Sequence, residues 1–455
     1  YVNVSGSYNV AVGPYTLAAS DGTLYNVAIG YSAMRLNTTG DYNTAVGNLA
    51  LYSNTTGISN SALGYQALYN NSTAQNNTAV GYQSLYANTS GSANVGVGVN
   101  ALYSNTTGVN NTALGTVSLY SNKSGNGNVA VGRSALYTAD GTQYNVAIGY
   151  RTMYSTTTGD SNTAVGYQAL YANTTGRQNV AIGHNALQSN TIGSFNIALG
   201  YTALASTTTG ISNVALGVGA LSYNITGSNN VAVGTQALYT ADGTLYNTAI
   251  GTSAMFYTTT GDANSAVGYQ ALYSNTIGIW NTSIGYQSLY SNTIGSRNIA
   301  LGYGTLAQNI SGSNNIAIGQ AALTNADGTF YNTAIGHQAM RQTTIGDYNA
   351  AVGYQALYSN TTGTYNAAFG VNALYSNTTG YNNAAHGYQA LYNNIGGYGN
   401  VGLGVNALYN NTYGYTNVAV GQGTLYSNKT GDNNVAIGYQ SLYTADNISY
   451  NVAVG

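Results

Sequence analysis

Apolar and polar residues alternate along this chain in a pattern that returns every 17 residues. The motif Asn-x-Ala-x-Gly starts at Asn9 and recurs without insertion or deletion as far as Asn451, a span of 442 residues or 26 periods of 17. With the asparagine as position 0, the unit reads approximately N-[VT]-A-[VIL]-G-Y-Q-A-L-Y-S-N-T-T-G-x-x. Self-similarity at a short fixed period is typical of stacked repeat architectures. Because the period never slips, we expect each unit to contact its neighbours directly.

Each unit contains two short apolar runs that favour β-strands. Side chains at positions 1 to 3 alternate between two faces, and positions 7 to 9, such as residues 67–69, form a second alternating run. The unit is too short for a helix–turn–helix repeat, and its recurrent glycines disfavour a helix. The sequence therefore predicts an all-β fold, a parallel β-solenoid (β-roll) of about 27 coils with 17 residues and two short strands per coil. Strands stacked about 4.8 Å apart would make a rod of roughly 130 Å.

The predicted interior is a narrow lumen. Positions 1 and 3 are apolar and share one face, so we expect them to point inward together with the Leu or Met at position 8. Phe369 and His386 at position 3 occur in coils where position 1 shrinks to Ala, as confined packing would require. The predicted core includes Val10, Val12, Leu51, Leu68 and Leu85. The other strand face carries Ala and Gly, which favours close lateral approach by another chain.

The composition excludes several classes of protein. Lys, Arg and Asp total 18 residues, charged residues are 4% of the chain, and Glu is absent. A net charge of −2 supplies no basic surface for nucleic acid and no polybasic membrane patch. No apolar run approaches the roughly 20 residues of a membrane-spanning helix. Cys is absent, which removes disulfides and thiolate metal sites.

Aspartate pairs are the only carboxylate constellation. Asp21 with Asp41, and Asp140 with Asp160, occupy positions 12 and 15 of adjacent coils. Calcium takes about six to eight oxygen ligands, so two carboxylates make only weak calcium candidates. The alternative, which we favour, is that Asp-Gly forms a turn and the second Asp caps the next one. The three histidines have no catalytic partners of their own, so we expect no catalytic residue and no cofactor.

Columns of identical residues offer two further candidate surfaces. Tyr at position 9 predicts an aromatic ladder that includes Tyr52, Tyr69, Tyr86, Tyr103, Tyr120 and Tyr137. Such ladders stabilise a rod, and their rings could also contact carbohydrate or protein. On the long turn, recurrent Asn-x-Thr/Ser sequons are compatible with glycosylation or with turn geometry. Thr columns on the same turn leave ice binding as an alternative function.

The strand motif resembles a known family of repeats. Asn-Val-Ala-Val-Gly at residues 9–13, followed after two residues by a small residue and Leu, looks like the head repeat of trimeric autotransporter adhesins, the YadA-like β-roll. Similar Asn-x-Ala-x-Gly repeats occur in phage tail-fibre shafts. The resemblance covers essentially the whole chain, although the coil here is longer. It implies a left-handed β-roll, a homotrimer, a cell-surface or virion location, and a role in attachment.

These observations together predict a non-enzymatic extracellular fibrous protein. We expect a surface adhesin or self-assembling fibre shaft that forms a homotrimer or filament and contacts carbohydrate or a host surface. A phage tail-fibre shaft and an ice-binding solenoid are the alternatives. We expect no nucleic-acid partner and no membrane insertion. Because the chain starts and stops in mid-coil without polar caps, we expect residues 1–455 to be one continuous array within a longer fibre.

Overall fold

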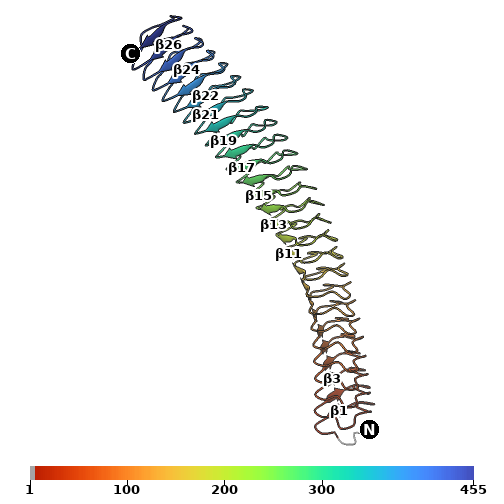
Figure 1. The fold of residues 1–455 in the computed structure, drawn as a ribbon. Helices are drawn as coiled ribbons and strands as arrows, with labels where there is room; N and C mark the ends of the chain where they lie inside the picture. The colour runs from red at the N-terminus through yellow and green to blue at the C-terminus, as the bar shows by residue number, and fades with distance from the viewer. Residues whose placement is uncertain (1–5) are drawn as a thin grey trace. The chain divides into compact units, whose positions relative to one another are not determined.

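The chain folds as a parallel β-solenoid, as predicted (Figure 1). A computed structural model describes residues 6–455, and these residues contain 27 three-residue strands and no helix. They divide into two compact units, the first ending at Asn229 and the second spanning Asn230–Gly455. Residues 1–5, which we expected to continue a preceding coil, lie outside the described residues. That the two units form one continuous array stays a prediction.

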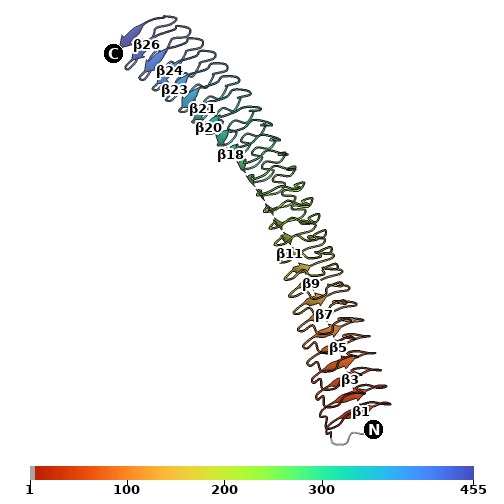
Figure 2. The ribbon, with the colours of Figure 1, turned by 45° about the vertical axis from the view of Figure 1, so that its right-hand side comes forward.

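Each coil contributes one strand, which covers positions 1 to 3 of the repeat (Figure 2). The first unit contains β1 (Val10–Val12), β2 (Val27–Ile29), β3 (Thr44–Val46), β4 (Ser61–Leu63), β5 (Thr78–Val80), β6 (Val95–Val97), β7 (Thr112–Leu114), β8 (Val129–Val131), β9 (Val146–Ile148), β10 (Thr163–Val165), β11 (Val180–Ile182), β12 (Ile197–Leu199) and β13 (Val214–Leu216). The second unit contains β14 (Val231–Val233), β15 (Thr248–Ile250), β16 (Ser265–Val267), β17 (Thr282–Ile284), β18 (Ile299–Leu301), β19 (Ile316–Ile318), β20 (Thr333–Ile335), β21 (Ala350–Val352), β22 (Ala367–Phe369), β23 (Ala384–His386), β24 (Val401–Leu403), β25 (Val418–Val420), β26 (Val435–Ile437) and β27 (Val452–Val454). Within each unit consecutive strands pair in parallel, and each residue lies opposite the residue 17 positions later, as in β10–β11 and β15–β16.

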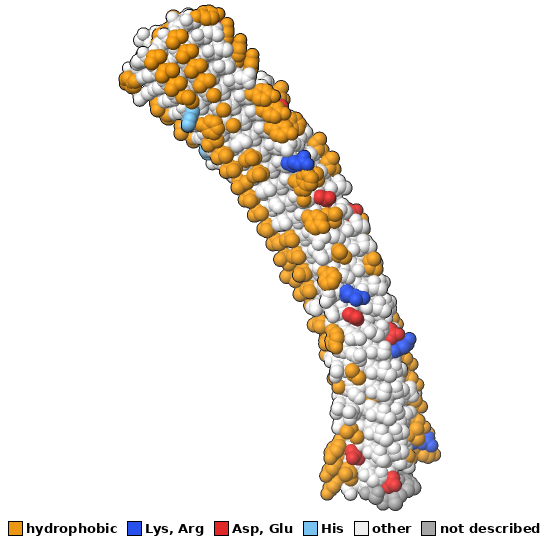
Figure 3. Space-filling view, in the orientation of Figure 1, with side chains coloured by type: hydrophobic (Ala, Val, Ile, Leu, Met, Phe, Trp, Pro, Cys, Tyr) orange, Lys and Arg blue, Asp and Glu red, His pale blue; other side chains and the backbone are white. Residues whose placement is uncertain are grey.

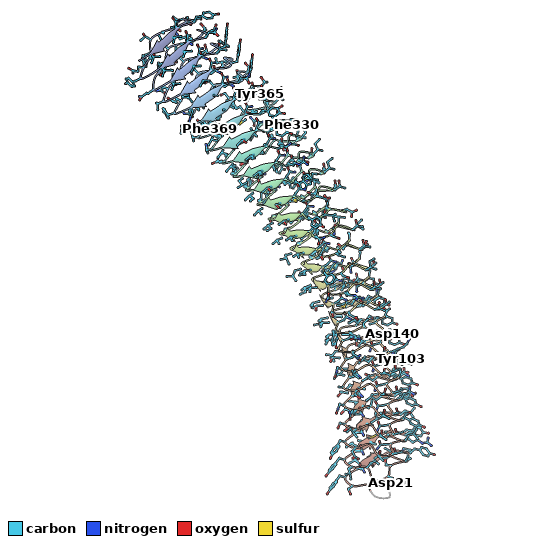
Figure 4. The ribbon with its side chains drawn as sticks, viewed as in Figure 1. Asp21, Tyr103, Asp140, Phe330, Tyr365 and Phe369 are labelled. Atoms are coloured by element: carbon cyan, nitrogen blue, oxygen red, sulfur yellow. The ribbon has the colours of Figure 1, made fainter. Side chains whose placement is uncertain are left out.

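The prediction that positions 1 and 3 of the strand point inward is wrong. Val10 and Val12 are 48% and 55% exposed, whereas the Ala at position 2 is buried in the coils between the ends, as Ala28 and Ala164 show. The position-8 prediction is confirmed, because Leu51, Leu68 and Leu85 are fully buried. Phe369, which we expected inside, is 40% exposed and projects outward from β22 (Figure 4), and His386 on β23 is exposed as well.

The reason is that the strand packs against leucine from the preceding coil. Position 2 is Gly in two coils, and a Cβ added at one of them, Gly96, would lie 3.4 Å from Leu85 Cδ1 and 2.6 Å from Ser84 Oγ. Only a methyl group or a comparably small side chain fits there, so a Val or Ile must take the opposite, outward face. The predicted Ala/Gly contact surface is therefore the inner wall of the coil.

The predicted second strand is also absent from these coils. Positions 5 to 10 form turns, because positions 6 and 8 have left-handed backbone, as at Gln168 (φ 50°) and Leu170 (φ 53°). The segment still bonds to its neighbours: Gln168 N donates to Tyr150 O at 3.0 Å, and Leu170 N donates to Ala186 O at 2.9 Å. The alternation of left-handed and right-handed backbone thus makes a tight turn, and the hydrogen bonds between coils are retained.

This backbone explains why position 8 is always Leu or Met. A left-handed non-glycine residue costs about 1–2 kcal/mol, and a side chain branched at Cβ suffers most. Complete burial of a large aliphatic side chain contributes about 1.5–3 kcal/mol, which offsets that cost. Leu170 is fully buried, so the position requires a large side chain that is not branched at Cβ.

Two further positions close the coil. Gly183, at position 4, has φ 136°, and a Cβ there would lie 2.4 Å from Gly200 O in the next coil. At position 0, Asn162 Nδ2 donates to Gly176 O at 2.9 Å within its own coil, and its Oδ1 accepts from Asn179 N at 2.9 Å in the next. This asparagine is at most 2% exposed in every coil from Asn26 to Asn434, so the interior contains a polar ladder beside the Ala and Leu columns.

Candidate interaction surfaces

The outward side chains of the strands form a largely apolar surface, which we name the strand face and define as positions 1 and 3 of every coil. On neighbouring strands of the first unit, Ile182 and Leu199 are 38% and 41% exposed. Figure 3 shows rows of hydrophobic side chains along the strand side of the second unit. No Lys, Arg or Asp occurs at position 1 or 3 in any of the 27 strands. The 18 charged residues all lie at positions 5, 6, 9, 12, 15 and 16.

The tyrosine column at position 9 forms the predicted ladder. Ring centroids of successive members lie 5.1–5.3 Å apart and their planes differ by 9° or less from Tyr52 to Tyr137. A second ladder runs from Tyr358 to Tyr443 in the other unit. The faces of each internal ring, such as that of Tyr103 (Figure 4), are covered by its neighbours. The ladder therefore offers ring edges and hydroxyl groups to a partner, and only its end rings offer an open face.

Stacking also changes the acidity of these phenols. Burial raises the pKa of Tyr69, and the neighbouring Tyr52 and Tyr86 raise it further. The same causes raise the pKa of Tyr392 and Tyr426 in the second ladder. The raised pKa of these three phenols favours their neutral form, which agrees with a stabilising role.

The predicted calcium candidates act as hydrogen-bond acceptors for backbone. Asp41 Oδ1 accepts from Leu24 N at 2.7 Å, and Asp160 Oδ1 accepts from Gln143 N at 2.8 Å, each in the preceding coil. Asp140 (Figure 4) accepts from the backbone N–H of Lys123 at 3.1 Å and pairs with its Nζ at 3.2 Å. Between residues 6 and 455 no group of three or more acidic or His side chains could hold a metal ion. The geometry favours the capping role for these carboxylates.

The capping role at position 15 extends beyond the predicted aspartates to Ser and Asn, which the sequence analysis missed. Besides the aspartates, Ser92 Oγ accepts from Gln75 N at 3.2 Å, and Asn126 Oδ1 accepts from Val109 N at 2.8 Å. In each case the side chain satisfies the N–H at position 15 of the preceding coil, which the backbone leaves free. The recurrence of Asp, Ser and Asn at position 15 with a 17-residue spacing was the signal that could have identified it.

The asparagines of the long-turn sequons are inaccessible. Their Asn lies at position 11, and Asn54 and Asn105 are fully buried. Asn54 Nδ2, the atom that a glycan would occupy, donates to Asn37 Oδ1 at 2.7 Å and to Gly57 O at 3.0 Å. These asparagines therefore serve coil closure, and a folded coil cannot present them to a glycosyltransferase.

The threonine column at position 12 is likewise engaged. Thr55 Oγ1 donates to Ser72 O at 3.0 Å, and Thr106 Oγ1 donates to Lys123 O at 3.0 Å. An ice-binding face depends on hydroxyl groups that are free to order water, whereas these hydroxyls bond to the next coil. Ice binding stays a prediction, but this column gives it no specific support.

The histidines belong to surface columns. His184 stacks between Tyr167 and Tyr201 at ring-centroid distances of 4.8 and 5.3 Å, and His337 stacks on Tyr354 at 5.3 Å. Neither of these stacked His–Tyr groups brings an acid, a base and a nucleophile together in one cleft, which is the arrangement that catalysis requires. The expectation that the chain is not an enzyme stays untested.

Comparison with known proteins identifies no family: no family model matches the chain, and no curated protein is significantly similar. A search of residues 6–455 for helices long and apolar enough to span a bilayer finds none.

Proposed function

We propose that this chain is a segment of an extracellular fibre shaft or surface adhesin, without enzymatic activity, whose copies associate side by side through the strand face. The single observation that supports this is the exclusion of charge from an exposed surface. Positions 1 and 3 are as accessible as many turn positions, yet none of the 18 charged residues occurs there. Charged side chains improve the solubility of a surface that stays in contact with water. On a surface covered by a partner they weaken the contact, because they must be desolvated.

The coil-to-coil bonding suits a load-bearing rod. Within each unit, backbone hydrogen bonds and the position-0 asparagine ladder link each coil to the next, and the tyrosine ladder adds contacts in the coils that contain it. Pulling two coils apart must break these contacts together, because they lie in parallel around one coil.

A second copy of the chain is the partner that fits the strand face best. Its strands repeat at the same spacing, so rows of Val, Ile and Leu on two copies can interdigitate along their length. Three parallel copies are proposed because the resemblance to trimeric adhesin heads implies that number. Carbohydrate or a host surface would then be contacted by the turns and by the tyrosine edges.

The mass of the purified chain in solution tests the association. We expect an oligomer by light scattering, and a monomer after Ile148→Lys, Ile182→Lys and Leu199→Lys on the strand face. The matched control places three lysines on the exposed turn, at Thr158, Thr175 and Thr209, and should keep the oligomer. A wild-type monomer, or equal loss of association in both triple variants, would refute the strand face as the contact.

The alternative functions separate by simple measurements. A virion shaft performs the same mechanical role, and virion genes beside the coding sequence would identify it. An ice-binding solenoid should show thermal hysteresis in the isolated chain, which a shaft should not.

A further inference from the structure

The interior contains a second asparagine ladder, at position 11, that is interrupted at defined coils. In ordinary coils each of these side chains donates to the preceding one, as Asn309 Nδ2 does to Asn292 Oδ1 at 2.7 Å. The same Nδ2 donates to the carbonyl oxygen of position 14, here Gly312 O at 3.0 Å. In three coils with an Asp-Gly turn, which we name the marked coils, position 11 is instead Ala, at Ala139, Ala241 and Ala326.

Position 14 changes together with position 11. It is Thr in those coils, at Thr142, Thr244 and Thr329, where most other coils have Gly. A Cβ added at Gly57 would lie 2.4 Å from Asn54 Oδ1 in its own coil and 2.9 Å from Asn71 Nδ2 in the next. The threonine side chain therefore projects toward position 11 of both coils. Within the marked coil the exchange conserves volume, since Asn plus Gly and Ala plus Thr contain the same number of side-chain heavy atoms. The following coil has Thr in place of Asn at position 11 and so contains one side-chain heavy atom fewer, as at Thr343.

The exchange conserves volume but not hydrogen bonding. Thr329 and Thr343, at position 11 of the following coil, are fully buried, and neither hydroxyl has a partner among residues 6–455. Asn309 Oδ1, which faces Ala326 where the ladder would continue, also lacks one. The same pair of unpartnered hydroxyls recurs at two other marked coils, in Thr142 with Thr156 and in Thr244 with Thr258.

Among residues 6–455 the unpartnered threonine hydroxyls are confined to the marked coils and the coils that follow them, so threonine at position 11 is not itself the cause. Thr207 occupies position 11 in a coil that does not follow a marked one, and its Oγ1 donates to Asn224 O at 2.9 Å. A buried hydroxyl without a partner loses the hydrogen bonds that it makes in water. Converging buried polar groups of this kind are the usual setting of an internal water molecule, which makes about three hydrogen bonds.

We propose that each of these three marked coils binds one ordered water molecule inside the solenoid. The hydroxyl at position 14 and the hydroxyl at position 11 of the following coil hold it, and Asn309 Oδ1 adds an acceptor in the copy around Ala326. The water replaces the missing asparagine amide as the link between successive coils. The inference does not rest on the proposed function.

A crystal structure of the whole chain that resolves ordered water tests the site directly. We expect density within hydrogen-bond distance of both Thr329 Oγ1 and Thr343 Oγ1, and at the two other marked coils. In the variant Ala326→Asn/Thr329→Gly the restored amide should displace that water, while the sites at Thr142 and Thr244 keep theirs as internal controls. Empty density, with the hydroxyls turned to backbone carbonyls, would overturn the proposal.

A second measurement does not depend on crystals. The amide of Ser313 donates to Thr329 O at 3.0 Å and reports on this coil by hydrogen exchange. If Thr329 binds water, Thr329→Val leaves that water short of a partner, and exchange should become about fivefold faster. If the hydroxyl is simply unpartnered, the same change removes a cost and exchange slows, which would refute the site. Thr362→Val, at an exposed turn position, is the control and should leave the rate unchanged.

Discussion

Asn111→Asp should destabilise the solenoid at neutral pH and much less in acid. Asn111 is a fully buried member of the position-0 ladder. Its Nδ2 donates to Gly125 O at 2.7 Å and to Asn94 Oδ1 at 3.1 Å. An aspartate would replace the donor Nδ2 with a carboxylate oxygen, which can only accept, and so would place two acceptors face to face at both of these contacts. Its other oxygen would still accept from Asn128 N, as Asn111 Oδ1 does at 3.0 Å.

The size of the effect follows from proton linkage. Two facing acceptors and burial hold the folded pKa of the new carboxyl well above its unfolded value of about 3.9. Below that value both states are protonated, and the variant loses about one hydrogen bond, roughly 1 kcal/mol. Above it only the unfolded state ionises, so stability falls by about 1.4 kcal/mol per pH unit until the folded pKa is reached. At pH 7 the additional loss is at most about 4 kcal/mol.

Urea unfolding followed by circular dichroism, at pH 3 and pH 7, measures this difference. The control is Asn110→Asp, the same chemical change one residue earlier, because Asn110 is exposed and has a left-handed φ of 58° that Asp tolerates. We expect a small effect in the control at both pH values. A loss in Asn111→Asp that is equal at pH 3 and pH 7, or equal to that of the control, would refute the role assigned to the ladder.

Three further predictions follow from single contacts. Gly302→Ala should destabilise by about 3 kcal/mol or more in urea unfolding, because its Cβ would lie 2.8 Å from the backbone of the next coil at φ 136°. Gly304→Ala has open space around it and should cost only about 1–2 kcal/mol, the cost of a left-handed alanine. Stability should fall as pH rises from about 10 through the raised pKa of Tyr392, since the folded state there retains a proton that the unfolded state loses, and Tyr392→Phe should reduce this fall in an alkaline titration. Lys123→Met should cost less than about 1 kcal/mol and only at low salt, because its ion pair with Asp140 is 3.2 Å long but exposed; a larger, salt-independent loss would contradict this.

The period and the stacking could be predicted from the sequence because both follow from spacing alone. A 17-residue repeat without slippage requires equivalent residues to lie next to one another, and the tyrosine ladder from Tyr52 onward is the direct consequence. The absence of the second strand could not be predicted, because left-handed backbone at Leu170 leaves no signal in the sequence when the residue is not glycine. The buried asparagine ladders could not be predicted either, because an asparagine such as Asn54 or Asn162 is as typical of an exposed turn as of a buried ladder.

The inside and outside of the strand were exchanged because alternation shows which side chains share a face and not which face is buried. A different property of the repeat does distinguish them, namely how much size each column tolerates. Position 2 never exceeds Ala or Ser in 27 copies, while position 3 ranges from Val to Phe369 and His386. A close-packed interior forbids such variation and a surface permits it. Position 3 thus varies in size as a surface does, yet no Lys, Arg or Asp occurs there. Freedom in volume combined with exclusion of charge fits a surface that meets another protein. Position 13 of the long turn shares both properties, but it is mostly Thr, Ser or Gly, whereas position 3 is Val, Ile or Leu in all but two coils. The strand face is therefore the more apolar of the two surfaces and the place to look for the partner.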